Sequence, residues 1–74
     1  MKTLGRVNGI ISNIVIAKVD GAVGQNEICY VYCGETRMMA EVIKVIGDEA
    51  YVQVYDSTRG LKIGDCHAIY TELQ

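Results

Sequence analysis

Residues 42–65 read VIKVIGDEAYVQVYDSTRGLKIGD, and this stretch decides the fold. Residues 42–46 are a run of mostly β-branched apolar side chains, and residues 50–55 alternate between Ala or Val and Tyr or Gln. Strict alternation of this kind is typical of a strand with one buried face. The polar tripeptide GDE at residues 47–49 suits a short hairpin connection. The stretch therefore predicts a β-hairpin.

The hairpin is followed by turn chemistry in residues 56–60 (DSTRG). Asp, Ser and Thr side chains bond nearby backbone N–H groups, and Gly60 supplies a positive φ if the turn needs one. We expect Leu61 and Ile63 to return to the core after this turn.

The rest of the chain carries the same kind of signal. Strands are predicted over residues 4–7, 10–19, 27–33 and 66–73, and the first hairpin strand is predicted to begin at residue 37. Asn8-Gly9 predicts a turn, and Asn13 marks a bulge or a second turn. Helical apolar periodicity is absent, and turns about every ten residues are typical of small barrels. We expect one domain over residues 1–74 with an all-β fold, a small closed six-stranded β-barrel.

The net charge and composition of the chain limit the classes of molecule that it is expected to bind. The chain has 74 residues, half of them hydrophobic, and a formal net charge of −2. This balance gives no electrostatic support for binding nucleic acid or an anionic membrane. The sequence has no apolar run long enough to span a membrane and no signal-peptide pattern at its start.

Three cysteines, an odd number, are predicted to be free thiols in a reducing compartment, which favours an intracellular protein. Cys29 and Cys33 share a strand face, but four residues along a strand span roughly 13 Å, too far for one metal ion. Cys66 belongs to no C-x-x-C pair. We expect the cysteines to pack as small hydrophobic side chains, without a metal site.

His67 is the only histidine and follows Cys66 directly. A hydrolase built on these two residues needs an orienting carboxylate and a nucleophile within reach, and the sequence places neither. The favoured interpretation is a histidine on the surface or at an edge.

The five tyrosines permit two interpretations. An aromatic platform for stacking bases requires a positively charged groove as well, which an acidic chain does not favour. We therefore expect the rings to pack in the barrel or at a subunit interface. The five are Tyr30, Tyr32, Tyr51, Tyr55 and Tyr70.

The nucleotide-binding motifs G-x-x-x-x-G-K-[ST] and G-x-G-x-x-G are both missing from the sequence. We expect no catalytic, cofactor-binding or metal-ligating residues in this chain, and no bound cofactor.

Residues 47–65 also resemble a segment of the N-terminal β-barrel domain of the catalytic A subunit (alpha chain) of V-type and archaeal-type ATPases. The matching positions are Gly47, Asp48, Gln53, Val54, Tyr55, Asp56, Thr58, Gly60 and Leu61. Further matches are Gly5-Arg6-Val7, Asn8-Gly9, residues 14–17, residues 25–27, Arg37 and residues 40–43. The resemblance covers residues 5–65 and is nearest to bacterial V-type subunits. Residues 66–74 lack the Gly-Pro-Gly-Leu with which the family continues.

The resemblance implies an assembly role. In this family six A and B subunits alternate in a ring, and their N-terminal barrels pack side by side as a collar far from the membrane. The chain is then expected to contact neighbouring B subunits, without nucleic acid or direct membrane contact, in the cytoplasmic part of a proton or sodium pump. The ATP-hydrolysing or ATP-synthesising activity, with its ATP and Mg²⁺, belongs to the parent subunit. The chain is either a domain cut from that subunit or a stand-alone relative.

Charged side chains are expected to set partner choice more than affinity. The candidates are Arg37, Glu41, Lys44, Asp56 and Arg59. The alternative function is a free-standing barrel of the oligonucleotide-binding or SH3-like kind that binds nucleic acid or peptide. Salt-dependent binding to single-stranded oligonucleotides separates the two, because a collar domain is expected to show none at physiological salt.

Overall fold

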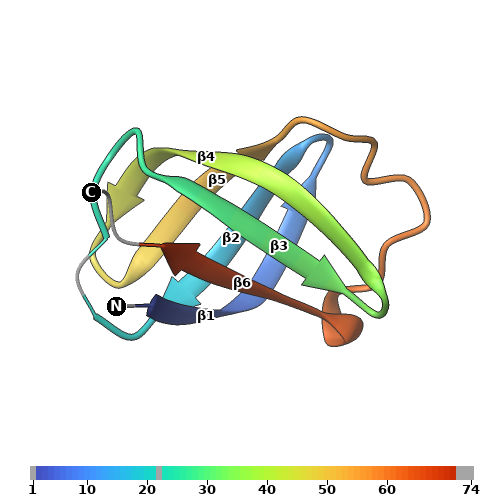
Figure 1. Ribbon diagram of the computed structural model, residues 1–74, viewed down its shortest axis with the longest axis horizontal. Coiled ribbons are helices and arrows are strands. Elements are labelled where there is room, and N and C mark those ends of the chain that lie inside the picture. The colour runs from blue at the N-terminus through green and yellow to red at the C-terminus, as the bar shows by residue number, and fades with distance from the viewer. Residues whose placement is uncertain (1, 22, 72–74) are drawn as a thin grey trace.

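A computed structural model describes residues 2–21 and 23–71 as a closed barrel of six antiparallel strands (Figure 1). The strands are β1 (Lys2–Ile11), β2 (Ile14–Val19), β3 (Ile28–Cys33), β4 (Thr36–Ile46), β5 (Glu49–Val54) and β6 (Cys66–Thr71). A single 3₁₀ turn, η1 (Ile63–Asp65), precedes β6. This architecture confirms the predicted all-β six-stranded barrel. The described residues include no helix of the length and apolarity that a membrane crossing requires.

The strands follow one another around the barrel in the order β1-β2-β5-β4-β3-β6, and β6 closes the circle by pairing with β1. Successive hairpins link β3, β4 and β5, and the chain then returns through a long connection to lay β6 beside β3. This is a Greek key. The connection forms the orange loop at one end of the barrel in Figure 1.

The predicted hairpin is formed by β4 and β5, with Val42 opposite Val52 and Ala40 opposite Val54. All four side chains are fully or almost fully buried. Gly47 in the connection has a φ of 60°, which glycine adopts without a steric penalty. The expected positive φ at Gly60 is also present, at 85°. The pattern that predicted the hairpin therefore predicted its buried face as well.

The first strand differs from its prediction. Asn8-Gly9 makes no turn, because β1 continues through it to Ile11 with a bulge between Val7 and Gly9. The reversal occurs at Ser12 and Asn13, the second-turn alternative, where Ser12 has a φ of 56°. The longer strand pairs with β2 on one side and β6 on the other, and this ladder outweighs the local turn preference of Asn-Gly.

The long connection packs only partly as expected. Leu61 lies against the core, but Ile63 is 46% exposed, so its predicted return to the core is wrong. The Thr58 hydroxyl donates a hydrogen bond to the Ser12 carbonyl and so ties the connection to the β1–β2 turn. The predicted last strand is observed from Cys66 to Thr71, and its residues 72 and 73 lie outside the described residues.

Small side chains fill the barrel interior. The buried residues are Val7, Val15, Ala17, Val19, Cys29, Val31, Cys33, Met38, Ala40, Val42, Ala50, Val52, Val54 and Cys66. Valine and alanine suit a narrow barrel, whose interior is just wide enough for side chains to fill. The outward residues of every strand then form the surface that meets other molecules.

Candidate functional site

The interior offers no reactive site. Among the residues whose burial the structure describes, no polar or charged residue is buried. A catalytic or ligand-binding cavity in a barrel needs polar groups that converge on it. In the described part of the chain, the polar and charged side chains lie on the outer surface.

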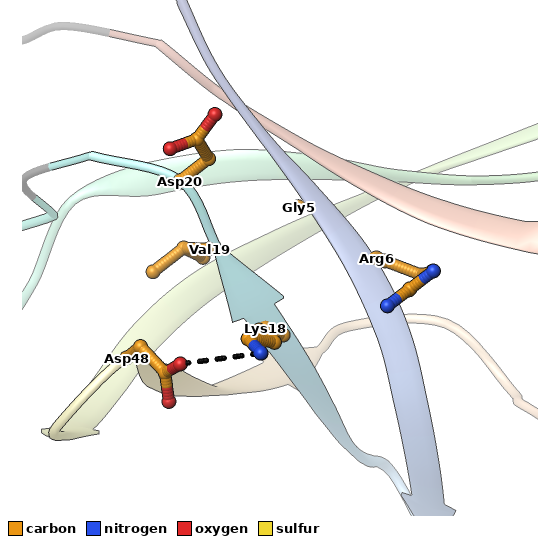
Figure 2. Close-up of a pocket in the computed structure, with 6 residues that line it drawn as sticks. All are labelled: Gly5, Arg6, Lys18, Val19, Asp20 and Asp48. Atoms are coloured by element: carbon orange, nitrogen blue, oxygen red, sulfur yellow. Dashed lines mark ion pairs between the residues drawn. The ribbon is translucent and has the colours of Figure 1, made fainter.

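An open hollow of about 540 Å³ lies on that surface beside Gly5 and Arg6 of β1 and the end of β2. Figure 2 shows its lining, in which Lys18 on β2 points at Asp48 of the β4–β5 turn. The Lys18 Nζ is 3.5 Å from the Asp48 Oδ2 atom, and both side chains are exposed. An exposed pair of this kind contributes at most about 1 kcal/mol. The described residues that line the hollow bring a lysine and an aspartate together.

The cysteines differ from their prediction. Cys33 on β3 and Cys66 on β6 form a disulfide, so the prediction that these two are free thiols is wrong. They are direct cross-strand partners, and Gly34 N–H donates to the Asp65 carbonyl beside them, which makes them a non-hydrogen-bonded pair. Side chains approach most closely at such pairs. The sequence-based prediction of an intracellular protein rested on free thiols, and the disulfide removes that support.

Cys29 is the one free cysteine in the described part of the chain, and it is fully buried on β3. Burial, with a smaller contribution from Glu27, raises the pKa of this thiol from 9.0 to about 12. The described residues contain no group of three His, Cys, Asp or Glu side chains that could hold a metal ion. Cys29 therefore acts as a small core side chain, as predicted.

We expect Cys29 to resist alkylation by iodoacetamide at pH 8 in the folded chain, and to react at once in 6 M guanidinium chloride. The thiolate is the nucleophile, and a pKa of about 12 leaves roughly one thiol in ten thousand ionised at pH 8. Mass spectrometry of the labelled peptide measures both rates. Rapid labelling of the native chain contradicts this assignment.

The structure rejects a hydrolase built on Cys66 and His67. The Cys66 sulfur is bonded to Cys33 and supplies no thiolate nucleophile. His67 points outward and stacks on Tyr32, with ring centroids 5.5 Å apart and planes inclined by 8°. The predicted surface histidine is confirmed.

Four of the five tyrosines have described side chains, and these four lie on the outside of the barrel. Tyr30, Tyr32 and Tyr51 are half-buried and Tyr55 is 56% exposed, so the option of packing in the interior is wrong for these four. The Tyr70 side chain lies outside the described part of the chain. The Arg37 guanidinium carbon is 4.7 Å from the Tyr30 ring centroid, which covers one face of that ring. Rings covered in this way make a poor platform for bases.

An apolar stripe follows the outside of β4. Its members are Met39, Ile43 and Ile46 on β4, and Tyr55, which directly follows β5. These side chains are between 36% and 56% exposed. A register shift between Val42 and Lys44 leaves Ile43 as an extra residue in the pairing with β5. Exposed apolar groups gathered along one element mark a surface for another protein. The run VIKVI, in which only Lys44 is polar, was the available sequence signal, because its adjacent apolar residues break the alternation of a half-buried strand.

Three of the five predicted partner-choosing charges lie along this stripe. Arg37 rests on Tyr30, Glu41 accepts a hydrogen bond from Tyr55, and Lys44 lies 5.6 Å from the Tyr51 ring centroid. Asp56 and Arg59 are exposed in the long connection and are not brought into the stripe. The stripe thus alternates apolar and charged groups, as the rim of a protein interface does.

A side-chain hydrogen bond between Tyr55 and Glu41 holds the Tyr55 ring in place at one end of the stripe. The Tyr55 hydroxyl donates to the Glu41 Oε1 atom at 2.8 Å. This hydrogen bond is the main reason why the pKa of Tyr55 is raised above its usual value of 10.0. Tyr55 N–H also donates to the Met39 carbonyl, so the ring is held beside β4.

Comparison with known proteins agrees with this architecture. Residues 7–66 match the family model described as ATP synthase alpha/beta family, beta-barrel domain. The chain is 42% identical over 65 residues to a V-type ATP synthase alpha chain of Borreliella afzelii (strain PKo), covering 88% of this chain. It is 42% identical over 64 residues to V-type ATP synthase alpha chain 1 of Treponema pallidum (strain Nichols), covering 86%. It spans 11% of the length of each of these relatives.

Proposed function

The chain belongs to the ATP synthase alpha/beta family, as its beta-barrel domain, and from this premise we propose that it is the collar domain of a V-type ATP synthase A subunit (alpha chain). In this role it holds the ring of alternating A and B subunits together. The similarity to V-type alpha chains supports the choice of subunit. The domain itself is not catalytic.

The observation that carries this proposal is the apolar stripe on β4. A closed barrel leaves no strand edge for another sheet to pair with, so a partner must be bound through outward side chains. Met39, Ile43 and Ile46 offer such side chains, with Glu41 and Lys44 among them. A neighbouring B-subunit barrel that covers the stripe removes this apolar surface from water.

The proposal places the chemistry elsewhere in the complex. ATP and Mg²⁺ bind to other parts of the parent subunit, where hydrolysis or synthesis is coupled to proton or sodium transport. The barrel lies in the cytoplasmic, peripheral part of that complex, away from the membrane. It makes no contact with nucleic acid.

Replacing both Ile43 and Ile46 by lysine is expected to weaken binding of this chain to the B subunit of the same complex at least about tenfold. The substitutions remove two apolar side chains that the B subunit covers in the proposed contact, and they place two charges there. Each apolar anchor of this kind contributes about 1–2 kcal/mol to binding. Isothermal titration calorimetry with the purified B subunit measures the change in Kd.

The matched control is Ile11→Lys combined with Ile63→Lys. Both residues are exposed apolar side chains outside the stripe, and the double variant gains the same charge. Thermal melts establish that all variants remain folded. Equal weakening by the two double variants, or no binding by the unsubstituted chain, refutes the assignment of the stripe.

A further inference from the structure

A row of basic and aromatic side chains crosses five of the six strands on the outer surface. Its members, in order, are Lys18 on β2, Arg6 on β1, His67 on β6, Tyr32 on β3 and Arg37 on β4. Each is the direct cross-strand partner of the next in the observed register. Directly opposite residues have Cβ atoms about 4.5–5.5 Å apart, so the row is continuous.

Every member of the row faces outward. On β1, Arg6 is exposed and its neighbour Val7 is buried, and on β6, His67 is exposed next to buried Cys66. Lys18 and Arg37 are exposed too, and Tyr32 is half-buried. The row is therefore available to another molecule along its whole length.

The charges in the row are poorly matched within the chain. Arg6 lies directly opposite Lys18, and like charges in this position destabilise a sheet. Figure 2 shows their charged ends turned away from one another, with Lys18 directed to Asp48. Across residues 2–21 and 23–71, no carboxylate forms an ion pair with Arg6 or Arg37. An arrangement that breaks a local stability rule is commonly found at a functional site.

Aromatic rings restrict two side chains of the row. Tyr32 stacks on His67, and the Arg37 guanidinium lies over Tyr30 on the same face of β3. Stacking restricts a side chain while its N–H groups remain free to donate at the edge. The guanidinium of Arg37, restricted in this way, matches the geometry of a carboxylate.

We infer that this row is a docking surface for an acidic, extended segment of another protein chain. Arg6 and Arg37 are three strands apart, or about 14 Å, which is the reach of about four extended residues. Carboxylates four residues apart in the segment can then contact both guanidinium groups. This surface meets the β4 stripe only at Arg37, and it does not depend on the collar function.

Nucleic acid fits this row less well. Arg37 covers one face of the Tyr30 ring and His67 covers one face of the Tyr32 ring, so these faces are closed to bases. Beyond Lys18 the row meets Glu49, its partner on β5, and a long phosphate backbone that continues in this direction meets a like charge. A short acidic segment ends before that point.

The test is an NMR titration of the ¹⁵N-labelled chain with a blocked octaglutamate peptide at 50 mM salt. We expect shift changes centred on β1, β6 and the beginning of β4. Replacing Arg6 and Arg37 together by glutamate is expected to weaken binding about tenfold or more, because two ion pairs become two repulsions. The control, Arg59→Glu with Lys62→Glu, makes the same charge change in the exposed long connection and is expected to alter Kd less than twofold.

Three results overturn the inference: no shift change at 50 mM salt, equal weakening by both double variants, or tighter binding of a ten-nucleotide thymidine strand than of the peptide. The last result assigns the row to nucleic acid instead. Thermal melts of both variants exclude unfolding as the cause of lost binding, and a variant that melts early is replaced by Arg6→Gln with Arg37→Gln.

Discussion

Replacing Val52 by aspartate is expected to unfold the barrel at room temperature. Val52 is fully buried and lies between Val15 on β2 and Val42 on β4. The surrounding core consists of apolar side chains, so the new carboxylate meets no hydrogen-bond donor from a side chain there. Burying an unpaired charge costs several kcal/mol even after relaxation. A domain of 74 residues has little more stability than that to lose.

Gln53→Asp is the control for this variant. Gln53 is the next residue on β5 and is exposed, so the same side chain introduced there stays in water. We expect its free energy of unfolding to change by less than about 1 kcal/mol. Circular dichroism during heating and urea titration measures both. A Val52→Asp chain that melts within a few degrees of the unsubstituted protein contradicts the closed, dry interior described above.

The sequence was sufficient to predict the strands that carry clean alternation. Residues 50–55 and 27–33 place Val52 and Val31 on buried faces, because a period of two is set by strand geometry and needs no knowledge of neighbours. Closure into a barrel also followed, since six short amphipathic strands expose edges unless the sheet closes.

Features that depend on pairing between distant strands were not predicted. Asn8-Gly9 is a strong turn signal by itself, but pairing with both neighbours keeps β1 extended and turns Asn8 into a bulge. The disulfide and the basic row depend on β6 lying between β1 and β3. Local sequence does not determine that placement, because a 33-residue separation divides Cys33 from Cys66.

Reduction of the Cys33–Cys66 disulfide is the second change with a large expected effect. The bond closes a loop with a sequence separation of 33 and joins two strands of the Greek key. In the chain-entropy model, opening a loop of this length costs about 3–4 kcal/mol of stability, because the unfolded chain regains that freedom. Urea unfolding with and without a phosphine reductant measures the difference.

Cys33→Ala with Cys66→Ala is the control, because its stability is expected to match that of the reduced chain and not to respond to reductant. Cys33 also lines a surface hollow of about 170 Å³ beside Gly60 and Lys62, which gives a reductant access to the bond. If the stability of the unsubstituted chain does not respond to reductant, strand pairing alone holds β6 in place.

A loss of stability of the expected size on reduction has a consequence for the proposed collar. In a reducing cytoplasm the barrel then depends on its neighbours in the ring for the stability that the bond provides, since a partner that binds only the folded form stabilises it.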